Sequence, residues 1–442
     1  MLIIDTSKGT NMPHRVVTTD TECTGKQPMR KANIEAIVAY IESGIKPADE
    51  PGGLGVEVEQ FITRGNDEPV MYSGERGVDW LLTKLTDVFP ERSYGKDGEL
   101  IGVAREGKTV TLEPGAQVEL SSGPYRKICA VQTDFEQFEE QISAILKPEG
   151  LQMVPYGYRP RGHAEEIELI PKKRYDFMDA YFDTIGPYGK RMMRCSAATQ
   201  ISIDFYSAED CVHKLRIASI LAPIFTLLCD NTPYFEDEPR THPLMRADVW
   251  HWCDPDRCES VPHATEPNYS LADYAEFVLD TPAILVPNGD DFQPDDRTFG
   301  EIYANKAMNN DEVEHALSML FTDVRIKRYL EIRPADSMPA PYVAAYASLI
   351  KGLFYHEQNL ETLEAELVGI TNTDIAETRT DLAAHGYAGI AYGKPVHETI
   401  LHLFDLAENG LEDDEKPFLE SLRHCAREKT SLADRKAPLQ SA

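Results

Sequence analysis

The stretch VRIKRYLEIR, residues 324–333, alternates polar and apolar side chains with a period of two. Successive side chains of a β-strand point to opposite faces of a sheet, so this pattern predicts one strand with a polar and an apolar face. The polar face carries Arg325, Lys327, Tyr329, Glu331 and Arg333, and the apolar face carries Val324, Ile326, Leu330 and Ile332. We expect this strand to cover an apolar core on one side and to present mixed charges on the other.

The same alternation occurs in three segments further upstream. They are GVEVEQFI (55–62), VTLEPGAQVELSS (110–122) and ATQISIDF (198–205). Their polar faces carry Glu57 and Glu59; Glu113, Gln117 and Glu119; and Gln200, Ser202 and Asp204. Any half-exposed antiparallel strand alternates in this way, so a single segment indicates little about function. Four such strands, however, bring five glutamates to polar faces, together with the cations of residues 324–333.

These five glutamates predict a particular chemistry if their strands are neighbours. Carboxylates gathered on one sheet repel each other unless a cation neutralises them. Hard carboxylate oxygens suit Mg²⁺, which in turn commonly holds phosphate groups. The pattern therefore favours a magnesium–nucleotide site on the polar face of a sheet.

The remaining segments favour an α+β fold, because strands and helices do not alternate regularly. Periodicity predicts helices at 32–46, 77–89, 133–147, 174–184 and 208–229, and strands at 54–62, 99–104, 108–113, 116–121, 151–157, 197–205 and 324–333. Further helices are predicted at 340–354, 358–368, 372–384, 396–408 and 413–427. Since no linker or repeat interrupts the chain, we expect one catalytic domain at 31–442, mostly helical over 338–442, after a flexible segment at 1–30.

Composition limits the classes of function. The 442 residues carry 44 basic and 74 acidic side chains, a net charge of −30, and 42% are apolar. That apolar share predicts a globular protein, while the net charge argues against binding to nucleic acid or to anionic membranes. No run approaches the roughly 20 apolar residues that span a bilayer, and the start lacks a signal-peptide pattern. We expect a cytoplasmic protein, and its oligomeric state stays open.

Other motifs are better explained without a site. The chain has no GxxxxGK[ST] loop, and the histidines of HETILH (397–402) lie five positions apart, too far round a helix to share a metal. Cys253 and Cys258 lack a second pair of ligands and are interpreted as structural or free thiols. Cys195 is interpreted as a packing residue. The acidic stretch NGDDFQPDD (288–296) lacks calcium-loop spacing and is predicted to be a surface turn.

The alternating strands and several other segments together resemble the glutamate–cysteine ligases of the plant and proteobacterial type. The matching stretches are GVEVEQF (55–61), TLEPGAQVELSSGP (111–124), IPKKRYDFM (170–178), RCSAATQISIDFYSAED (194–210), KLRIASILAPIFTLLCDNTPYFE (214–236), MRADVW (245–250) and RIKRYLEIRPAD (325–336). They follow the family's order from about residue 32 to the C-terminus. The resemblance implies a curved, mainly antiparallel, glutamine-synthetase-like sheet, with helices on its apolar face and a helical C-terminal region.

The resemblance also implies an activity, which is the joining of the γ-carboxylate of L-glutamate to the amine of L-cysteine through γ-glutamyl phosphate. This reaction consumes ATP, requires Mg²⁺ and is the first step of glutathione biosynthesis. By resemblance, the Mg²⁺ ligands are Glu57, Glu59, Glu113, Glu119 and Glu331; the catalytic residues are Glu331 and Arg333; and the substrate pockets include Arg194, Gln200, Ser202, Tyr329 and Arg246. Candidate binders of substrate carboxylates are Lys172 and Arg174, and also Arg161 and His163. For Arg161 and His163, a solvated loop is an equally weighted alternative.

Three departures from the family pattern leave the acceptor amine open. Ser202 stands where the family has asparagine, and Val58 stands where it has histidine. The cysteines do not reproduce the plant regulatory disulfides. Two alternatives therefore remain: a related ligase that joins glutamate to a different amine, and a non-catalytic sensor of glutamate or nucleotide.

Overall fold

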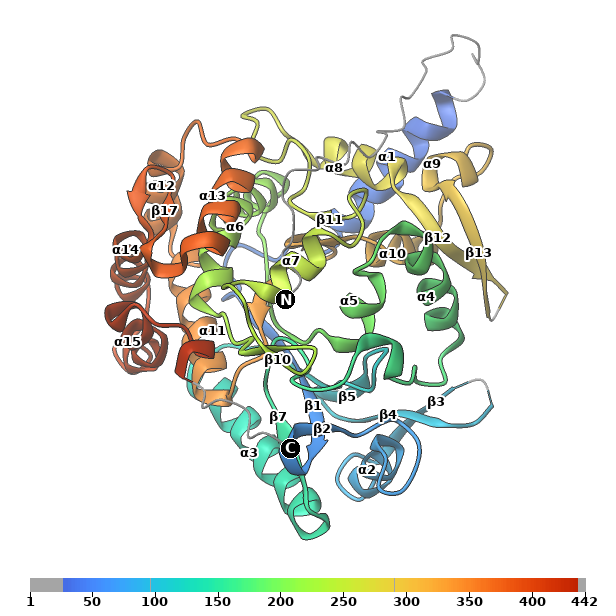
Figure 1. The fold of residues 1–442 in the computed structure, drawn as a ribbon. Coiled ribbons are helices and arrows are strands. Elements are labelled where there is room, and N and C mark those ends of the chain that lie inside the picture. Colours follow the sequence, from blue (N-terminus) through green and yellow to red (C-terminus); the bar gives the residue numbers. More distant parts are fainter. Residues whose placement is uncertain (1–26, 96, 290, 436–442) are drawn as a thin grey trace, which may run out of the picture.

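Ten antiparallel strands form one sheet at the centre of the computed structural model, which describes residues 27–95, 97–289 and 291–435 (Figure 1). Eight of them follow in the order β15 (Val324–Ile326), β16 (Leu330–Asp336), β8 (Ala198–Ile203), β1 (Leu54–Arg64), β6 (Val118–Tyr125), β5 (Lys108–Leu112), β4 (Leu100–Arg105) and β3 (Glu91–Tyr94). The short strands β2 (Glu68–Pro69) and β7 (Leu151–Val154) pair with the far end of β1. The predicted α+β fold with a mainly antiparallel sheet is confirmed.

The pairing register explains why the polar side chains meet. Glu57 lies opposite Gln200, and Glu59 lies opposite Glu119. Directly opposed residues of antiparallel strands point to the same face of the sheet. Val58, between the two glutamates of β1, points to the other face and is 2% exposed. The polar faces predicted for separate strands are therefore one continuous face.

The prediction of a single strand over residues 324–333 is wrong. The chain forms β15, reverses over residues 327–329 and returns as β16, so that Arg325 lies opposite Glu331. The N–H of Lys327 donates to the carbonyl of Tyr329 at 2.8 Å and closes the turn. This turn contains neither glycine nor proline, and the polar–apolar alternation continues through it. The pattern alone therefore does not indicate the reversal.

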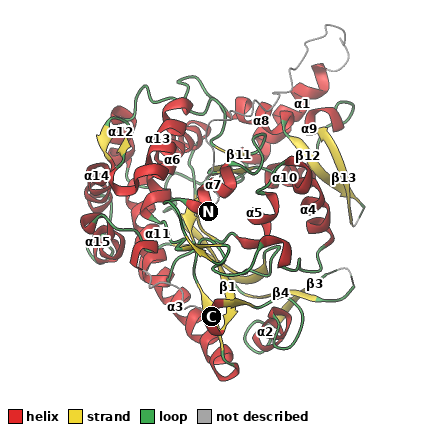
Figure 2. Ribbon diagram, viewed as in Figure 1, coloured by secondary structure: helices red, strands yellow, loops and turns green. Residues whose placement is uncertain are grey.

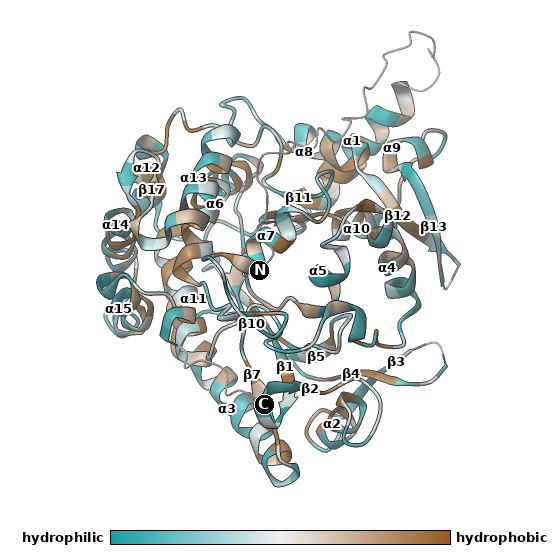
Figure 3. Ribbon diagram, viewed as in Figure 1, coloured by the Kyte–Doolittle hydropathy of each residue, from teal (hydrophilic) through white to brown (hydrophobic). Residues whose placement is uncertain are grey.

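Three long helices cover the apolar face of the sheet. They are α3 (Ile128–Leu146), α6 (Ala208–Leu228) and α11 (Ala340–Phe354). Helix α3 contacts β6 and β7, α6 contacts β15 and β16, and α11 contacts β1 and β8. Figure 3 shows α11 largely in the hydrophobic colour. Among the described residues, α6 alone is long and apolar enough to cross a membrane, but 89% of its most apolar window is buried inside the fold. This burial is typical of a core helix.

The C-terminal region is helical, as predicted. Its helices after α11 are α12 (Glu357–Glu366), α13 (Asn372–His385), α14 (Val396–Asn409) and α15 (Glu420–Glu428), with the short strands β17 (Ile390–Ala391) and β18 (Lys394–Pro395) between α13 and α14 (Figure 2). The last helix begins later than the predicted residue 413, because a 3₁₀ turn containing Pro417 precedes it. The proposed flexible segment at 1–30 falls mostly outside the described residues, and α1 (Gln27–Glu42) already includes its last residues. The single domain at 31–442 stays a prediction.

Shorter helices and strands complete the fold. Helices α2 (Val78–Leu85), α4 (Lys173–Ile185), α5 (Gly189–Cys195), α7 (Met245–His251), α8 (Leu271–Asp280), α9 (Phe299–Ile302) and α10 (Asn310–Ser318) belong here, with strands β9 (Tyr234–Phe235), β10 (Glu238–Pro239), β11 (Cys258–Glu259), β12 (Pro282–Asn288), β13 (Asp291–Thr298) and β14 (Phe321–Thr322). The acidic stretch 288–296, expected as a surface turn, forms the end of the β12–β13 hairpin and most of β13, apart from Asp290, which lies outside the described residues.

Candidate active site

A cavity of about 300 Å³ lies between the polar face of the sheet and the helices α4, α5 and α7. Ten predicted site residues line it: Glu57, Glu59, Glu113, Glu119, Glu331, Lys172, Arg174, Gln200, Arg246 and Arg333. The strand segments that carry the glutamates are separated by up to about 270 positions in the sequence. The predicted magnesium–nucleotide site required these strands to be neighbours, and the structure brings them together.

Three of the glutamates are crowded and poorly neutralised. Burial, followed by the charges of Glu119 and Glu331, raises the pKa of Glu57 to about 8. Burial and the charge of Glu113 raise the pKa of Glu119 to about 7. Burial also raises the pKa of Glu59, and Glu113 and Glu119 add to this shift. This part of the cavity therefore favours a proton or a metal cation.

Glu331 differs from these glutamates because cations surround it. Its Oε2 accepts from Nε and Nη2 of Arg325 at 2.7 and 2.6 Å and from Nη1 of Arg333 at 3.0 Å, and Nζ of Lys327 lies 3.5 Å from Oε1. Burial alone would raise the pKa of Glu331. The cations Arg325, Lys327 and Arg333 offset the burial and hold this pKa well below its usual value. Glu331 is therefore ionised, and any metal it binds shares it with two guanidinium groups.

Gln200 connects the two kinds of glutamate. Its Nε2 donates to Oε1 of Glu59 at 2.9 Å, and its Oε1 accepts from Nη1 of Arg333. The other oxygen of Glu59 accepts from the backbone N–H of Ala198 at 2.9 Å. The amide of Gln200 cannot turn over without losing both bonds, because its nitrogen only donates and its oxygen only accepts. Gln200 therefore fixes the direction in which Arg333 points.

Several cations of the cavity have donors to spare. Arg246 is 4% exposed, and no protein atom of the described residues accepts from its Nε. The same holds for Nε of Arg174. Lys172 lies with Nζ 4.9 Å from the ring centre of Tyr175, and burial lowers its pKa. Buried guanidinium groups with free donors favour ligands with carboxylate or phosphate oxygens.

Three predicted substrate-binding residues do not line this cavity. Arg194 is held by Asp179, to which Nε and Nη2 donate at 2.9 and 2.6 Å. Ser202 lies on the polar face opposite Glu331, but beyond the cavity wall. Tyr329 lies in the β15–β16 turn, with its ring centre 5.6 Å from Nζ of Lys327. Contacts of these three residues with substrate stay predictions.

Some cavity residues were not among the predicted candidates. Arg325 and Lys327 belong to the alternating stretch 324–333, so the pattern could have identified them. Met178, Met192, Met193, Phe321 and Trp250 form apolar parts of the wall. They come from α4, α5, α7 and β14, whose positions depend on tertiary contacts, and no local sequence signal marks them.

The other motifs lie away from the cavity. His163 is 53% exposed at its side chain, and Nε of Arg161 donates to the carbonyl of Asn66. Cys195 is fully buried, and burial raises the pKa of its thiol to about 11. Cys253 and Cys258 are buried free thiols, and on α14 the second histidine of HETILH, at position 402, pairs with a glutamate of α12. For the cysteines and HETILH these placements agree with the interpretations that assigned them to no site, whereas Arg161 and His163, candidate binders of substrate carboxylates, do not line the cavity.

The glutamates suit Mg²⁺ in kind, although they do not form a closed metal cage. Within residues 27–95, 97–289 and 291–435, no three His, Cys, Asp or Glu side chains are grouped closely enough to hold one ion. Mg²⁺ usually takes only one or two carboxylates, and its other ligands are water and substrate phosphates. The raised pKa values of Glu57 and Glu119 show a local shortage of positive charge. The donor set therefore fits an ion bound jointly by the protein and a phosphate ligand.

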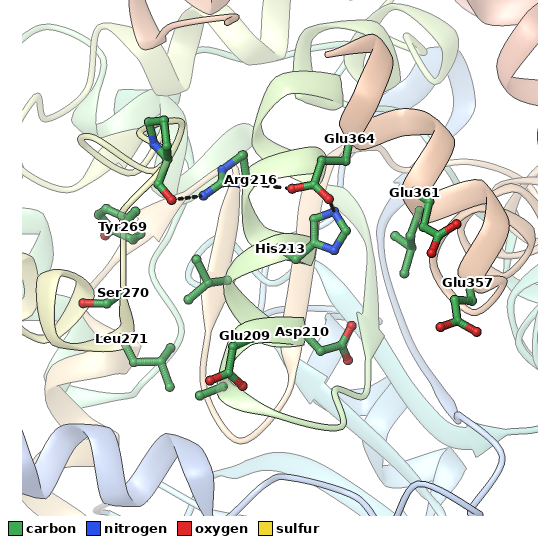
Figure 4. Close-up of a pocket in the computed structure, with 14 residues that line it drawn as sticks. Glu209, Asp210, His213, Arg216, Tyr269, Ser270, Leu271, Glu357, Glu361 and Glu364 are labelled. Carbon is green, nitrogen blue, oxygen red and sulfur yellow. Dashed lines mark hydrogen bonds and ion pairs between the residues drawn. The ribbon is translucent and has the colours of Figure 1, made fainter. Parts of the chain in front are cut away.

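A larger pocket, about 580 Å³, lies elsewhere, between α6, α12 and the start of α8 (Figure 4). Its acidic side chains are Glu209, Asp210, Glu357, Glu361 and Glu364. Figure 4 shows Glu364 facing His213 and Arg216, at 3.2 and 3.6 Å. None of the predicted site residues lines this acidic surface pocket, which is larger than the cavity but holds far fewer cations.

Comparison with known proteins agrees with the geometry. The family model of glutamate-cysteine ligase family 2 matches residues 53–381. The chloroplastic glutamate–cysteine ligase of Brassica juncea is 29% identical over 338 residues, which cover 74% of this chain and 65% of that protein. Glutamate–cysteine ligase B of Oryza sativa subsp. japonica is 27% identical over 396 residues, which cover 87% and 78%. The chain thus spans slightly under two thirds of the Brassica relative.

A solved structure shows the same fold. The crystal structure of a glutamate–cysteine ligase from Francisella tularensis in complex with AMP superposes with a TM-score of 0.51 at 12% identity, over 85% of this chain and 82% of that one. At this identity the likeness concerns the fold alone. It supports the sheet architecture inferred from the resemblance.

Proposed function

The chain belongs to glutamate-cysteine ligase family 2, and we propose that it joins the γ-carboxylate of L-glutamate to the amine of L-cysteine with consumption of ATP. The observation that carries this proposal is the convergence of five glutamates and Arg333 in one cavity. A matching family model over residues 53–381 supports it. The product would be γ-glutamylcysteine.

The chemistry explains why such a cavity is needed. A carboxylate is a poor electrophile and must be activated before an amine can attack it. An oxygen of the glutamate γ-carboxylate therefore first attacks the γ-phosphorus of ATP, and ADP leaves. The amine then attacks the γ-carbonyl carbon of the acyl phosphate, loses a proton, and inorganic phosphate leaves. Both steps concentrate negative charge on oxygen, which fixed cations stabilise. Arg333, oriented by Glu331 and Gln200, is the cation we assign to the transferred phosphoryl group.

The remaining cations suit the anionic groups of the substrates. In the part of the chain that the structure describes, Nε of Arg246 has no hydrogen-bond partner; Lys172 and Arg174 lie on the α4 side of the cavity. We assign them to carboxylate and phosphate oxygens that take no part in bond making. Holding these groups positions the γ-carboxylate against ATP and the amine against the acyl phosphate.

We also propose that Mg²⁺ binds here, held by Glu57, Glu59, Glu113 and Glu119 together with phosphate oxygens. A bound Mg²⁺ would neutralise charge on the phosphates during transfer. Glu331 is a less favourable ligand than the other four, because guanidinium groups already occupy one of its oxygens. A cytoplasmic location remains a proposal from the sequence.

The test is phosphate release from ATP by the purified protein with Mg²⁺ and L-glutamate, while L-cysteine and other amines are supplied in turn. We expect release to depend on cysteine, with γ-glutamylcysteine as the product. Release that prefers another amine would favour the related ligase, which Ser202 keeps possible. The absence of release with every amine would favour a sensor and would contradict the proposal.

A further inference from the structure

Arg379 connects the C-terminal helices to the wall of the cavity without lining it. It lies on α13 and is 8% exposed. Its Nη2 donates to Oδ2 of Asp323 at 2.7 Å. Its Nη1 lies 3.4 Å from Oε2 of Glu259 and 3.4 Å from Nδ1 of His251. One buried guanidinium therefore joins α13 to three residues that lie 56 or more positions earlier in the chain.

Asp323 leads directly to the catalytic strand. Its backbone carbonyl accepts from the N–H of Arg333 at 2.9 Å, and its N–H donates to the carbonyl of Glu259 at 2.7 Å. Asp323 also immediately precedes β15, which carries Arg325. A shift of Asp323 would therefore move the backbone at Arg333 and the guanidinium of Arg325 together.

The other two partners lead to the rest of the same wall. Glu259 lies in β11, which pairs in parallel with β14, and Phe321 of β14 lines the cavity. His251 is the last residue of α7, and Arg246 and Trp250 of the same helix also line the cavity. Of the elements that Arg379 reaches, α7 therefore lines the cavity itself, and β11 lies beside β14, which lines it.

Charge makes this contact more than a packing interaction. Asp323 and Glu259 both face Arg379; without the guanidinium, Asp323 would lose this ion pair and, among the described residues, Glu259 would keep only its contact with His251. Breaking a buried ion pair by removing one partner is strongly destabilising locally, because the remaining charge is uncompensated. The segments around Asp323 and Glu259 would then separate, and the cavity wall would lose its alignment.

We propose that Arg379 is a positioning residue that sets the orientation of Arg333 through Asp323, so that the C-terminal helices take part in the reaction. This inference rests on the proposed function, because its test measures the rate of ligation. A misplacement of about 1 Å in a reacting geometry can cost about 100-fold in rate. We therefore expect Arg379→Gln to lower kcat by about 10- to 100-fold and to change KM for ATP by less than about threefold.

Arg423 provides a matched control. It lies on α15, its side chain is 12% exposed against 10% for Arg379, and its Nη2 donates to Oε2 of Glu408 at 2.6 Å. It faces α14 and not the sheet, so Arg423→Gln should lower the melting temperature to a similar degree while kcat stays within about twofold. Equal losses of kcat in the two variants would overturn the inference.

A double-mutant cycle tests the route through Arg333. If Arg379 acts by orienting Arg333, Arg379→Gln should cost less than about threefold in a chain that already carries Arg333→Lys. The same loss in both backgrounds would overturn the assignment. Arg379→Lys, which keeps the charge, should recover at least about a third of the wild-type kcat.

Two further results keep the inferences separate. If Arg379→Gln does not fold, Asp323→Asn provides a second variant, because it removes the partner charge with little change of volume. We expect Asp323→Asn to lower kcat about tenfold, and an unchanged kcat would overturn the inference. Wild-type protein without ligase activity would contradict the proposed function itself. Wild-type ligation with an unchanged Arg379→Gln would overturn only the role of Arg379.

Discussion

The cavity on the sheet and the acidic surface pocket of Figure 4 each contain five carboxylates, yet they differ in how those carboxylates are held. In the cavity four of the five carboxylates come from strands whose register fixes their spacing, Glu113 directly follows β5, and burial raises the pKa of Glu57 to about 8. In the surface pocket they come from helices, and Glu209 has its pKa lowered by hydrogen bonds with its own backbone and with Ser207. The surface pocket is also the larger, at about 580 against 300 Å³. Neither pocket size nor the number of acidic residues therefore identifies the site; burial and opposed charge do.

The largest expected difference between the two regions comes from removing one carboxylate charge from each. Glu331→Gln takes away the anion that holds Arg325, Lys327 and Arg333 in place. We expect the ligation rate to fall by at least about 100-fold. Glu364→Gln, in the surface pocket, should leave the rate within about twofold. A Glu331→Gln variant with nearly full activity would show that the cavity is not the site.

A smaller loss is expected from the amide that orients Arg333. Gln200→Leu keeps the approximate volume but removes the acceptor of Arg333 and the donor to Glu59. We expect kcat to fall about tenfold. Gln132→Leu serves as the control, because Nε2 of Gln132 donates to Glu136 in the next turn of α3, outside the cavity, and the variant should show no loss. Equal kcat in both variants would contradict the role of Gln200.

Metal binding should depend on pH in the cavity. The pKa values of Glu57 and Glu119, about 8 and about 7, mean that both are largely protonated at pH 6, so Mg²⁺ must displace protons. Thermal melts should therefore show a larger stabilisation by Mg²⁺ at pH 8.5 than at pH 6, by about 2–3 °C. Glu361→Gln, in the surface pocket, should not alter this difference. A stabilisation by Mg²⁺ that is larger at pH 6 would contradict the assignment.

The smallest effect concerns the stability of the protein without Mg²⁺. Because the folded protein binds more protons than the unfolded chain between the ordinary glutamate pKa and about 8, its stability falls as pH rises through this window. Glu57→Gln removes the group whose ionisation lowers stability in this window, so we expect the melting temperature to rise by about 1–3 °C at pH 8.5. At pH 5 the change should be less than about 0.5 °C. Melts of Glu361→Gln at both pH values supply the reference, and a Glu57→Gln gain independent of pH would contradict the burial argument.

Much of the site was accessible from the sequence because strand periodicity is a local property. The alternation in 55–62 and 110–122 assigned Glu57, Glu59 and Glu119 to polar faces, and the register confirms that assignment. The family resemblance then related strands that are far apart in the chain. The α+β class and the helical C-terminal region followed from the same local patterns.

The rest depended on tertiary contacts that no local pattern encodes. The reversal at 327–329 lacks a turn residue, so 324–333 was expected as one strand although it is a hairpin. Trp250 and Met192 enter the wall from helices of seven residues, too short to show a clear period. Arg379 lies on a helix whose pattern gives no sign of a role, because its partners Asp323 and Glu259 come from elsewhere in the chain.

The most direct test of the central claim follows one oxygen atom. In the proposed reaction an oxygen of the glutamate γ-carboxylate forms the acyl phosphate and leaves with inorganic phosphate. With L-glutamate labelled by ¹⁸O in that carboxylate, together with ATP, Mg²⁺ and L-cysteine, ³¹P NMR of the released phosphate should show one ¹⁸O for each γ-glutamylcysteine formed. Phosphate without ¹⁸O, alongside product, would show that the carboxylate is not activated by phosphorylation and would contradict the mechanism assigned to this cavity.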